Sequence, residues 1–304
     1  MDFDLDATQQ ARLDHLSVLV DSDPRNDDGL PGSCDSALIA AVHADAMLTD
    51  EDLTLLDRIL LVEHAAKLGA RLDPTAQLLI APIARQGASR PMVGPCAIIV
   101  DGADGPVRGG ADVTTVVIVS ADSVSLADVQ GWIPVGSGFG SNYGTFTVGA
   151  RTAVPWPLTG SPLDIVRLGW AAEIAGAAQA AVEHAAAYLK QRKAFGLPLS
   201  TKQALRHRVS ELAVDAAGTS VLVRYGAFHN DPVAIASAVS YAAATAAKSP
   251  PELHQICGAR GFTSEFGLSI WTMRLEALRV ELGGTREAAV AHADARWVRS
   301  EVAS

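Results

Sequence analysis

The sequence predicts a mainly α-helical protein with a small β region in its middle. Apolar residues recur at helical spacing before residue 86 and again after residue 161. Between these parts lie short runs of β-branched residues separated by Gly, Pro, Asp and Asn, a pattern typical of strands joined by turns. We therefore expect three domains: N-terminal helices (1–85), a β domain (86–157) and a C-terminal helical bundle (158–304).

Several helices are predicted in the N-terminal part. An amphipathic pattern favours a first helix at 1–22, and the polar stretch with Pro and Gly at 21–32 predicts a loop. Further helices are expected at 33–46, 49–68 and 75–84. The second of these opens on acidic residues, which the positive end of a helix dipole stabilises.

Strands and then helices are predicted for the rest of the chain. The β-branched runs place strands at 97–100, 113–120 and 145–150. The helical pattern then places helices at 162–191, 200–229, 232–248, 251–257, 264–279 and 286–300. Breaks are expected at Asp231-Pro232 and Pro250-Pro251, because proline lacks the backbone N–H that a helix interior requires.

Composition limits the function classes. The chain has 304 residues, 49% of them hydrophobic, and a formal net charge of −10, which argues against nucleic acid as a main partner. No apolar run approaches the ~18 residues of a membrane span, and the acidic N-terminus lacks a signal-peptide core. Cys34, Cys96 and Cys257 are too widely spaced for a disulfide framework or a metal site. We therefore expect reduced thiols, no metal and a cytoplasmic protein.

The most informative stretch is the long helix at 162–191 and the basic turn after it. Ser161 can cap its N-terminus, and Pro162 can take the first helical position. Apolar residues along it recur at three- and four-residue steps, and many alanines on its other faces allow close packing. The turn Arg192-Lys193-Ala194-Phe195-Gly196 places cations at the negative end of the helix, and glycine can leave it with positive φ.

This region resembles the C-terminal domain of acyl-CoA dehydrogenases. The Ala-rich helix, the turn 192–196 and Gln203 form one similar segment. A second runs from Gln255 to Phe266 and is similar to the family's Gln-x-x-Gly-Gly-x-Gly-aromatic-Thr pattern, with Ala259 in place of the second Gly. A third, Gly283-Gly284-Thr285-Arg286-Glu287, is similar to its Gly-Thr-Ser-Glu/Gln segment. Together the three motifs cover residues 161–304.

The resemblance implies a set of FAD-binding residues. In the family, the residue matching Arg192 approaches the FAD pyrophosphate from a neighbouring subunit, and the residue matching Phe195 packs beside the adenine portion. The same resemblance assigns cofactor contacts to Gln203, Gln255, Gly258, Ala259, Thr285 and Glu287. Each also has a purely structural interpretation: a solvated helix end, a tight turn between helices, or, for Thr285, an N-cap.

The resemblance also shows what this chain lacks. The family places its catalytic Glu at one of two positions, occupied here by Val166 and Gly283, and neither residue can accept a proton. Glu281 lies two residues from the second position, and we expect it to be a surface or interface charge. The segment nearest to the family's flavin-ring strand and loop, at 81–90, lacks the hydroxyl and carboxyl positions. We therefore predict no catalytic residue in this chain.

These inferences predict a shortened subunit of a heterotetrameric (α2β2) acyl-CoA dehydrogenase of the actinobacterial type. Its N-terminal and β domains would be reduced, and it would help to introduce an α,β double bond into a CoA thioester, steroid-derived thioesters being one substrate class. A second dehydrogenase-like subunit would carry the catalytic Glu, and an electron-transfer flavoprotein-type acceptor would take the electrons. Two alternatives stay open: a homomeric flavoenzyme of the same fold, such as a monooxygenase or nitroalkane oxidase, and a non-catalytic scaffold.

Overall fold

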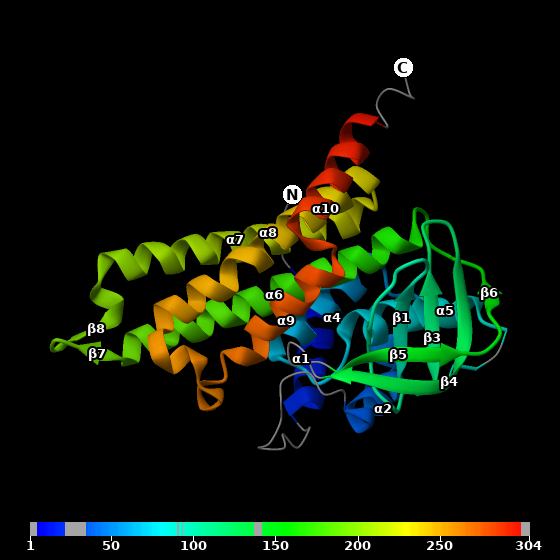
Figure 1. The fold of residues 1–304 in the computed structure, drawn as a ribbon, viewed down its shortest axis with the longest axis horizontal. Helices are drawn as coiled ribbons and strands as arrows, with labels where there is room; N and C mark the ends of the chain where they lie inside the picture. Colours follow the sequence, from blue (N-terminus) through cyan, green and yellow to red (C-terminus); the bar gives the residue numbers. More distant parts are fainter. Residues whose placement is uncertain (1–4, 22–34, 90, 93, 137–141, 299–304) are drawn as a thin grey trace.

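The N-terminal part of the chain is helical in the computed structural model (Figure 1). The structure describes residues 5–21, 35–89, 91–92, 94–136 and 142–298, so Cys34 and most of the predicted loop at 21–32 lie outside it. The helices are α1 (Ala7–Asp21), α2 (Ser36–Ala44), α3 (Ala46–Thr49), α4 (Leu55–Leu68), a π-helical stretch (Thr75–Ile80) and α5 (Ala81–Gly87).

One predicted helix of this part begins later than expected. The acidic residues after Thr49 do not open α4, which begins at Leu55 behind a capping box. The Thr54 hydroxyl accepts a hydrogen bond from the Asp57 backbone N–H at 3.2 Å, and the Asp57 carboxylate accepts one from the Thr54 N–H at 3.1 Å. This reciprocal pair satisfies two N–H groups that the helix itself leaves unpaired, and it sets the start of the helix.

The β region forms one mixed sheet. Its strands are β1 (Cys96–Val100), β2 (Val107–Arg108), β3 (Thr115–Val119), β4 (Val124–Gly136), β5 (Tyr143–Val148) and β6 (Thr152–Val154), in the order β1-β3-β4-β5-β2 with β6 on β4. Among the described strands, β1 and β3 are the only parallel neighbours. The long strand β4 was not predicted, because Asp128, Gly131 and Pro134 mimic turn signals. The sheet accommodates them through register shifts on both sides of the 131–134 pairing with β5.

The C-terminal part is helical again. Its elements are α6 (Pro162–Gln191), the hairpin strands β7 (Lys193–Ala194) and β8 (Leu197–Pro198), α7 (Gln203–His229), α8 (Pro232–Cys257), α9 (Ser269–Glu281) and α10 (Gly284–Ala293), with short 3₁₀ turns at Leu199–Thr201, Gly258–Phe262 and Ser264–Phe266 and a π-helical end at Asp294–Val298. The predicted bounds of the first helix, 162–191, are confirmed. None of the described helices is long and apolar enough to span a membrane.

One of the two predicted helix breaks is wrong. The break at Asp231-Pro232 is present. Asn230, with φ of 47°, is the C-cap of α7, and the Asp231 side chain caps the N-terminus of α8. Pro250-Pro251, in contrast, lies inside one continuous helix. An interior proline costs about 3 kcal/mol in an isolated helix. Here Pro250 is buried, and α8 packs along α6, α7, α9 and α10, so tertiary packing outweighs the local preference.

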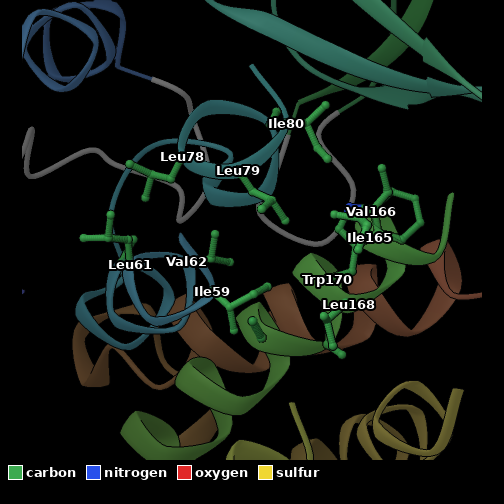
Figure 2. Close-up of a cluster of buried hydrophobic side chains, with 14 of the residues drawn as sticks. Ile59, Leu61, Val62, Leu78, Leu79, Ile80, Ile165, Val166, Leu168 and Trp170 are labelled. Carbon is green, nitrogen blue, oxygen red and sulfur yellow. The ribbon is translucent and has the colours of Figure 1, made fainter. Parts of the chain in front are cut away.

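α6 is the centre of the molecule. It packs against α4, α7, α8 and α9, and the β region lies at one end of it with the β7–β8 hairpin at the other (Figure 1). Figure 2 shows the core at the α4 side, where side chains of α4, the π-helical stretch and α6 interlock: Ile59, Leu61, Val62, Leu78, Leu79, Ile80, Ile165, Val166, Leu168 and Trp170. The closest approach is at Gly176, where an added Cβ would overlap the backbone carbonyl of Glu63.

This contact generates a stability prediction. Gly176→Ala should lower the free energy of unfolding by about 1–3 kcal/mol, because the new methyl group must push the α4 backbone away from α6. Gly218→Ala is the matched control: its Cβ meets the movable Tyr241 hydroxyl at 2.9 Å. Its stability should stay within about 1 kcal/mol of wild type, since alanine also favours the helix. Chemical denaturation of both variants measures the difference, and equal stabilities would contradict the prediction.

Candidate functional site

The turn after α6 projects from the helical bundle as a small hairpin (Figure 1). The backbone N–H of Arg192 closes α6 on the Tyr188 carbonyl at 2.8 Å, and the Leu199 N–H returns to the Arg192 carbonyl at 2.8 Å. At the tip, Phe195 has φ of 53° and Gly196 has φ of 81°. A positive φ is unfavourable for a bulky side chain, yet Phe195 adopts it. Phe195 is also 97% exposed. The hairpin therefore presents an aromatic ring away from its own chain.

The second predicted motif lies beside this hairpin. A hollow of about 440 Å³ is lined by His184, Ala187, Tyr188, Gln191, Arg192, Arg260 and Phe266. Its wall is aromatic, since Tyr188 meets Phe266 edge to face, with 4.9 Å between ring centroids. The Arg260 guanidinium carbon lies 6.0 Å from the Tyr188 centroid and 5.8 Å from that of Phe266. The fold thus brings Arg192 next to a segment about seventy residues later.

This hollow suits an anion that also carries a flat ring. Among the described residues that line it, Arg192 and Arg260 are charged and none is a carboxylate. A guanidinium offers a fixed fork of donors that matches phosphate oxygens. Gln255, Gly258 and Ala259 are exposed in the adjoining segment, and Gly258 has φ of 63°, so a ligand can approach that backbone closely.

The remaining predicted cofactor residues are Gln203, Thr285 and Glu287. Gln203 is exposed at the start of α7. Thr285 and Glu287 lie in the first turn of α10, and Glu287 lines a separate hollow of about 390 Å³ near the start of α6. At a rise of about 1.5 Å per residue, the two ends of α6 are roughly 40 Å apart. The predicted set therefore forms two groups, one at each end of α6.

The prediction that Thr285 caps the last helix is wrong. α10 begins at Gly284, and the capping position belongs to Gly283, which has φ of 78°. Two consecutive glycines with positive φ redirect the backbone between α9 and α10, so the helix begins one residue before Thr285. Thr285 is an exposed residue of the first turn.

A third hollow, of about 490 Å³, was not predicted. It lies between the sheet and the helices α6 and α9, and most of its wall is apolar: Ile98, Ile99, Val100, Val107, Val135, Trp170, Ala277 and Val280. Asp73, Arg108, Tyr143 and Glu281 provide its polar wall. The lining residues come from the segment before the π-helical stretch, from the sheet and its loops, from α6 and from α9, which only the tertiary fold brings together.

These polar residues belong to a buried ion cluster centred on Arg108. Its guanidinium binds the Glu173 carboxylate with both terminal nitrogens, at 2.9 and 3.1 Å. It also lies 3.1 Å from Asp73 and 3.2 Å from Glu281. The Tyr143 hydroxyl donates to Glu281 at 2.7 Å. One cation from β2 is thus shared among three carboxylates from three other segments.

Burial sets the protonation of this cluster. Desolvation raises the pKa of Glu281 to about 7, although Arg108 opposes the shift. Desolvation also raises the pKa of Asp73, and the neighbouring Glu173 adds to that effect. Burial alone would raise the pKa of Glu173 as well, but the bidentate contact with Arg108 lowers it overall. The carboxylate with the strongest contact to Arg108 is therefore charged, and Glu281 titrates near neutral pH.

The structure corrects the prediction that Glu281 is a surface or interface charge. Its side chain is 15% exposed and lines the third hollow. The prediction assumed an extended segment, whereas α9 stays helical through Glu281. A sequence signal was available: Glu281 lies four and seven residues after the buried Ala277 and Arg274, on the same helix face.

Two other positions singled out in the sequence are also located. Val166 is fully buried in the core, and Gly283 is exposed at the turn before α10. The segment at 81–90, which we compared with the flavin-ring strand and loop, is not a strand, because Ala81–Gly87 is helix α5. Among the described residues the sheet begins at Cys96, and the loop that follows β1 lines the third hollow.

Comparison with known proteins identifies a matching family model, relatives and similar structures. Residues 156–296 match the family model "Acyl-CoA dehydrogenase, C-terminal domain". The probable acyl-CoA dehydrogenase YngJ of Bacillus subtilis (strain 168) is 28% identical over 206 residues, which are 62% of this chain and 53% of that protein. The chain thus spans about half the length of this curated relative.

Similar solved structures cover the whole chain. The ChsE4-ChsE5 complex from Mycobacterium tuberculosis contains a chain with a TM-score of 0.77 at 16% identity, and the match covers 100% of this chain and 99% of that one. A steroid ACAD variant composed of Tcur3481 and Tcur3483 matches with a TM-score of 0.73 at 19% identity, over 98% of this chain and 97% of that one. Residues 156–296 thus match the acyl-CoA dehydrogenase C-terminal domain, and the chain as a whole has the acyl-CoA dehydrogenase fold.

Proposed function

We propose that this chain is a subunit of a heteromeric FAD-dependent acyl-CoA dehydrogenase, which introduces an α,β double bond into a CoA thioester. In this proposal, the hairpin end of the bundle contacts an FAD held mainly by a partner subunit. The observation that carries it is the hairpin itself, with its exposed Phe195 beside Arg192 and Arg260. The family match of residues 156–296 supports the class of enzyme.

The exposed apolar surface at this end supports an occupant from outside the chain. Phe195 is 97% exposed, Phe262 is 74% exposed and Leu197 is 54% exposed. Large apolar side chains gathered on one region are typical of surfaces that another molecule covers. Because the hairpin points away from its own bundle, that molecule belongs to another subunit or is bound by one.

The chemistry of this surface fits FAD. Arg192 and Arg260 offer donors to a pyrophosphate, and Tyr188, Phe195 and Phe266 offer flat faces to an adenine ring. When bound, the flavin supplies the acceptor for the hydride that leaves the thioester's β-carbon. The second group, with Thr285 and Glu287, lies at the other end of α6, so in this proposal it contacts a different flavin.

The proton must then be removed by the partner. Val166 and Gly283 cannot accept the proton from the α-carbon, and losing a general base typically costs about 10²–10⁴-fold in rate. Two similar solved structures are complexes of two different chains, and one of them is described as a steroid enzyme. We extend both features to this chain, with steroid-derived thioesters as the substrate class and an electron-transfer flavoprotein as the acceptor.

A second candidate function has one observation in its favour. Glu281 lines an apolar hollow, and its pKa of about 7 suits a general base. A homomeric flavoenzyme of the same fold, with its own acid–base group, would use such a residue. The contacts that Glu281 already makes weigh against it, because Arg108 and Tyr143 engage the two carboxylate oxygens that would have to reach the substrate proton.

The assembly is tested by expression with and without the dehydrogenase-like chain encoded nearest to this one. Alone, this chain should be poorly soluble or free of flavin, because its apolar hairpin end is uncovered. Coexpressed, the pair should copurify with about one FAD per two polypeptides. A stable, yellow homomer with one FAD per chain would instead establish the second candidate.

The cofactor contact is tested by Arg192→Ala in the assembled complex. Loss of one charge-assisted contact, about 1.5–3 kcal/mol, should weaken FAD binding about 10- to 100-fold. Arg151→Ala is the control, because Arg151 lies in the β region and pairs with Asp101. Its FAD affinity should equal that of the wild type. Equal affinity for both variants, measured by flavin fluorescence, would show that Arg192 does not contact the cofactor.

The origin of the catalytic base is tested by Glu281→Gln. The amide can keep contacts with Tyr143 and Arg108 but cannot accept a proton. If the partner supplies the base, turnover of the complex should stay within about threefold of wild type, since the general base, worth about 10²–10⁴-fold, is untouched. Loss of turnover with FAD content and assembly intact would place the base in this chain.

A further inference from the structure

The outer face of α7, at the edge of the helical bundle, carries a row of exposed apolar side chains (Figure 1). Five exposed residues form this row, which we call the α7 seam: Val214, Ala217, Val221, Tyr225 and Phe228. Its four large members are between 42% and 67% exposed in the part of the chain that the structure describes. The opposite face of α7 packs against α4, α6 and α8. Large apolar side chains gathered on one exposed face are typical of a surface that another molecule covers.

The spacing of the α7 seam fits an α-helix as the occupant. Successive members are three, four, four and three residues apart, so the steps average 3.5 residues. At about 100° per residue, all five side chains lie within an arc of about 80° on the helix. A narrow apolar row with this average step is the pattern by which one helix packs lengthwise along another.

The α7 seam is also complementary to itself. The order of its steps is the same from either end, with Val221 at the midpoint. When two copies of α7 pack antiparallel about a two-fold axis at Val221, each seam residue lies level with a seam residue of the other copy. Val221 then meets Val221 of the second copy. Ala217 lies level with Tyr225, and Val214 lies level with Phe228.

The sizes of the side chains favour this antiparallel arrangement. The aromatic residues lie in one half of the seam and the smaller residues in the other, so antiparallel packing places a large side chain beside a smaller one at both ends. A parallel pair would bring Phe228 against Phe228 and leave a gap between the two copies of Ala217. The rings of Tyr225 and Phe228 both pack on His229, with centroids 4.3 and 5.2 Å from its ring. Rings that are already held in place lose little entropy on binding.

We propose that the α7 seam joins two copies of this chain, through antiparallel packing of α7 on α7 about a two-fold axis at Val221. The proposal rests on the α7 surface alone and does not depend on the function proposed above. Val221 lies 18 residues after Gln203, or about 27 Å along the helix from the end that adjoins the hairpin. The contact between copies and the cofactor contact can therefore be tested separately.

The first test is Val221→Lys in the full chain, coexpressed with its partner where assembly requires it. Two cations would face each other at the axis, so the dissociation constant of the two copies should rise at least about 100-fold. Sedimentation equilibrium should then find half the mass of the wild-type assembly. Val18→Lys is the matched control, because Val18 is an exposed valine of α1, outside the seam, and it should keep the wild-type mass. The mass can be measured whether or not flavin is bound, so a failure of the proposed function leaves this result readable.

The second test distinguishes a second copy from any other occupant. Val221→Glu alone should also halve the mass. When Val221→Lys and Val221→Glu chains with different tags are coexpressed, they should copurify and restore the wild-type mass, because opposite charges then meet at the axis. A wild-type assembly with only one copy of this chain, or an unchanged mass in Val221→Lys, would overturn the proposal. A halved mass that the mixed pair does not restore would also overturn it and would show that a different molecule covers the seam.

Discussion

The burial of α6 is the constraint on which the rest of the fold depends. This 30-residue helix contacts α4, α7, α8 and α9, and many of its buried side chains are alanine or glycine. Small side chains allow neighbouring backbones to come close, as at Gly176, where the α4 backbone occupies the space of a missing Cβ. Without this central helix, the four helices around it would have no common surface to bury.

The length of α6 also separates the two groups of candidate cofactor residues. One group lies at the hairpin beyond its C-terminus, and the other at the start of α10 near its N-terminus. A rigid helix holds them about 40 Å apart. In the heteromeric enzyme proposed above, each end of the chain would therefore contact a different cofactor and a different neighbour.

The junction between the sheet and the helices is held by ionic contacts, unlike the apolar packing around α6. There, Arg108 joins β2 to α6, α9 and the segment before the π-helical stretch through ionic contacts in place of apolar packing. Buried ion pairs are weak sources of stability, since desolvation offsets much of their attraction. They do impose strict geometry, and here they leave a polar floor under an otherwise apolar hollow. The fold thus keeps charged groups beside the hollow.

The sequence by itself determined those elements for which capping residues, periodicity and turn residues all indicate the same bounds. Pro162, the helical period and the basic turn set the bounds of α6, and the glycine after Phe195 marks the hairpin that carries the candidate cofactor contacts. The three motifs at 192–203, 255–266 and 283–287 were likewise readable, because each is a short run of neighbouring residues. The sequence could not show that only the first two lie together.

Tertiary structure alone decided the remaining features. β4 extends through Asp128, Gly131 and Pro134 because β3 pairs with its first part and β5 with the rest. α8 continues through Pro250-Pro251 because packing outweighs the lost N–H groups. Arg108 and Glu281 are separated by more than 170 residues, and no local rule relates them. Their contact, their burial and the pKa of Glu281 exist only after sheet and helices meet, since desolvation and Coulomb interaction depend on distance in space and not on distance along the chain.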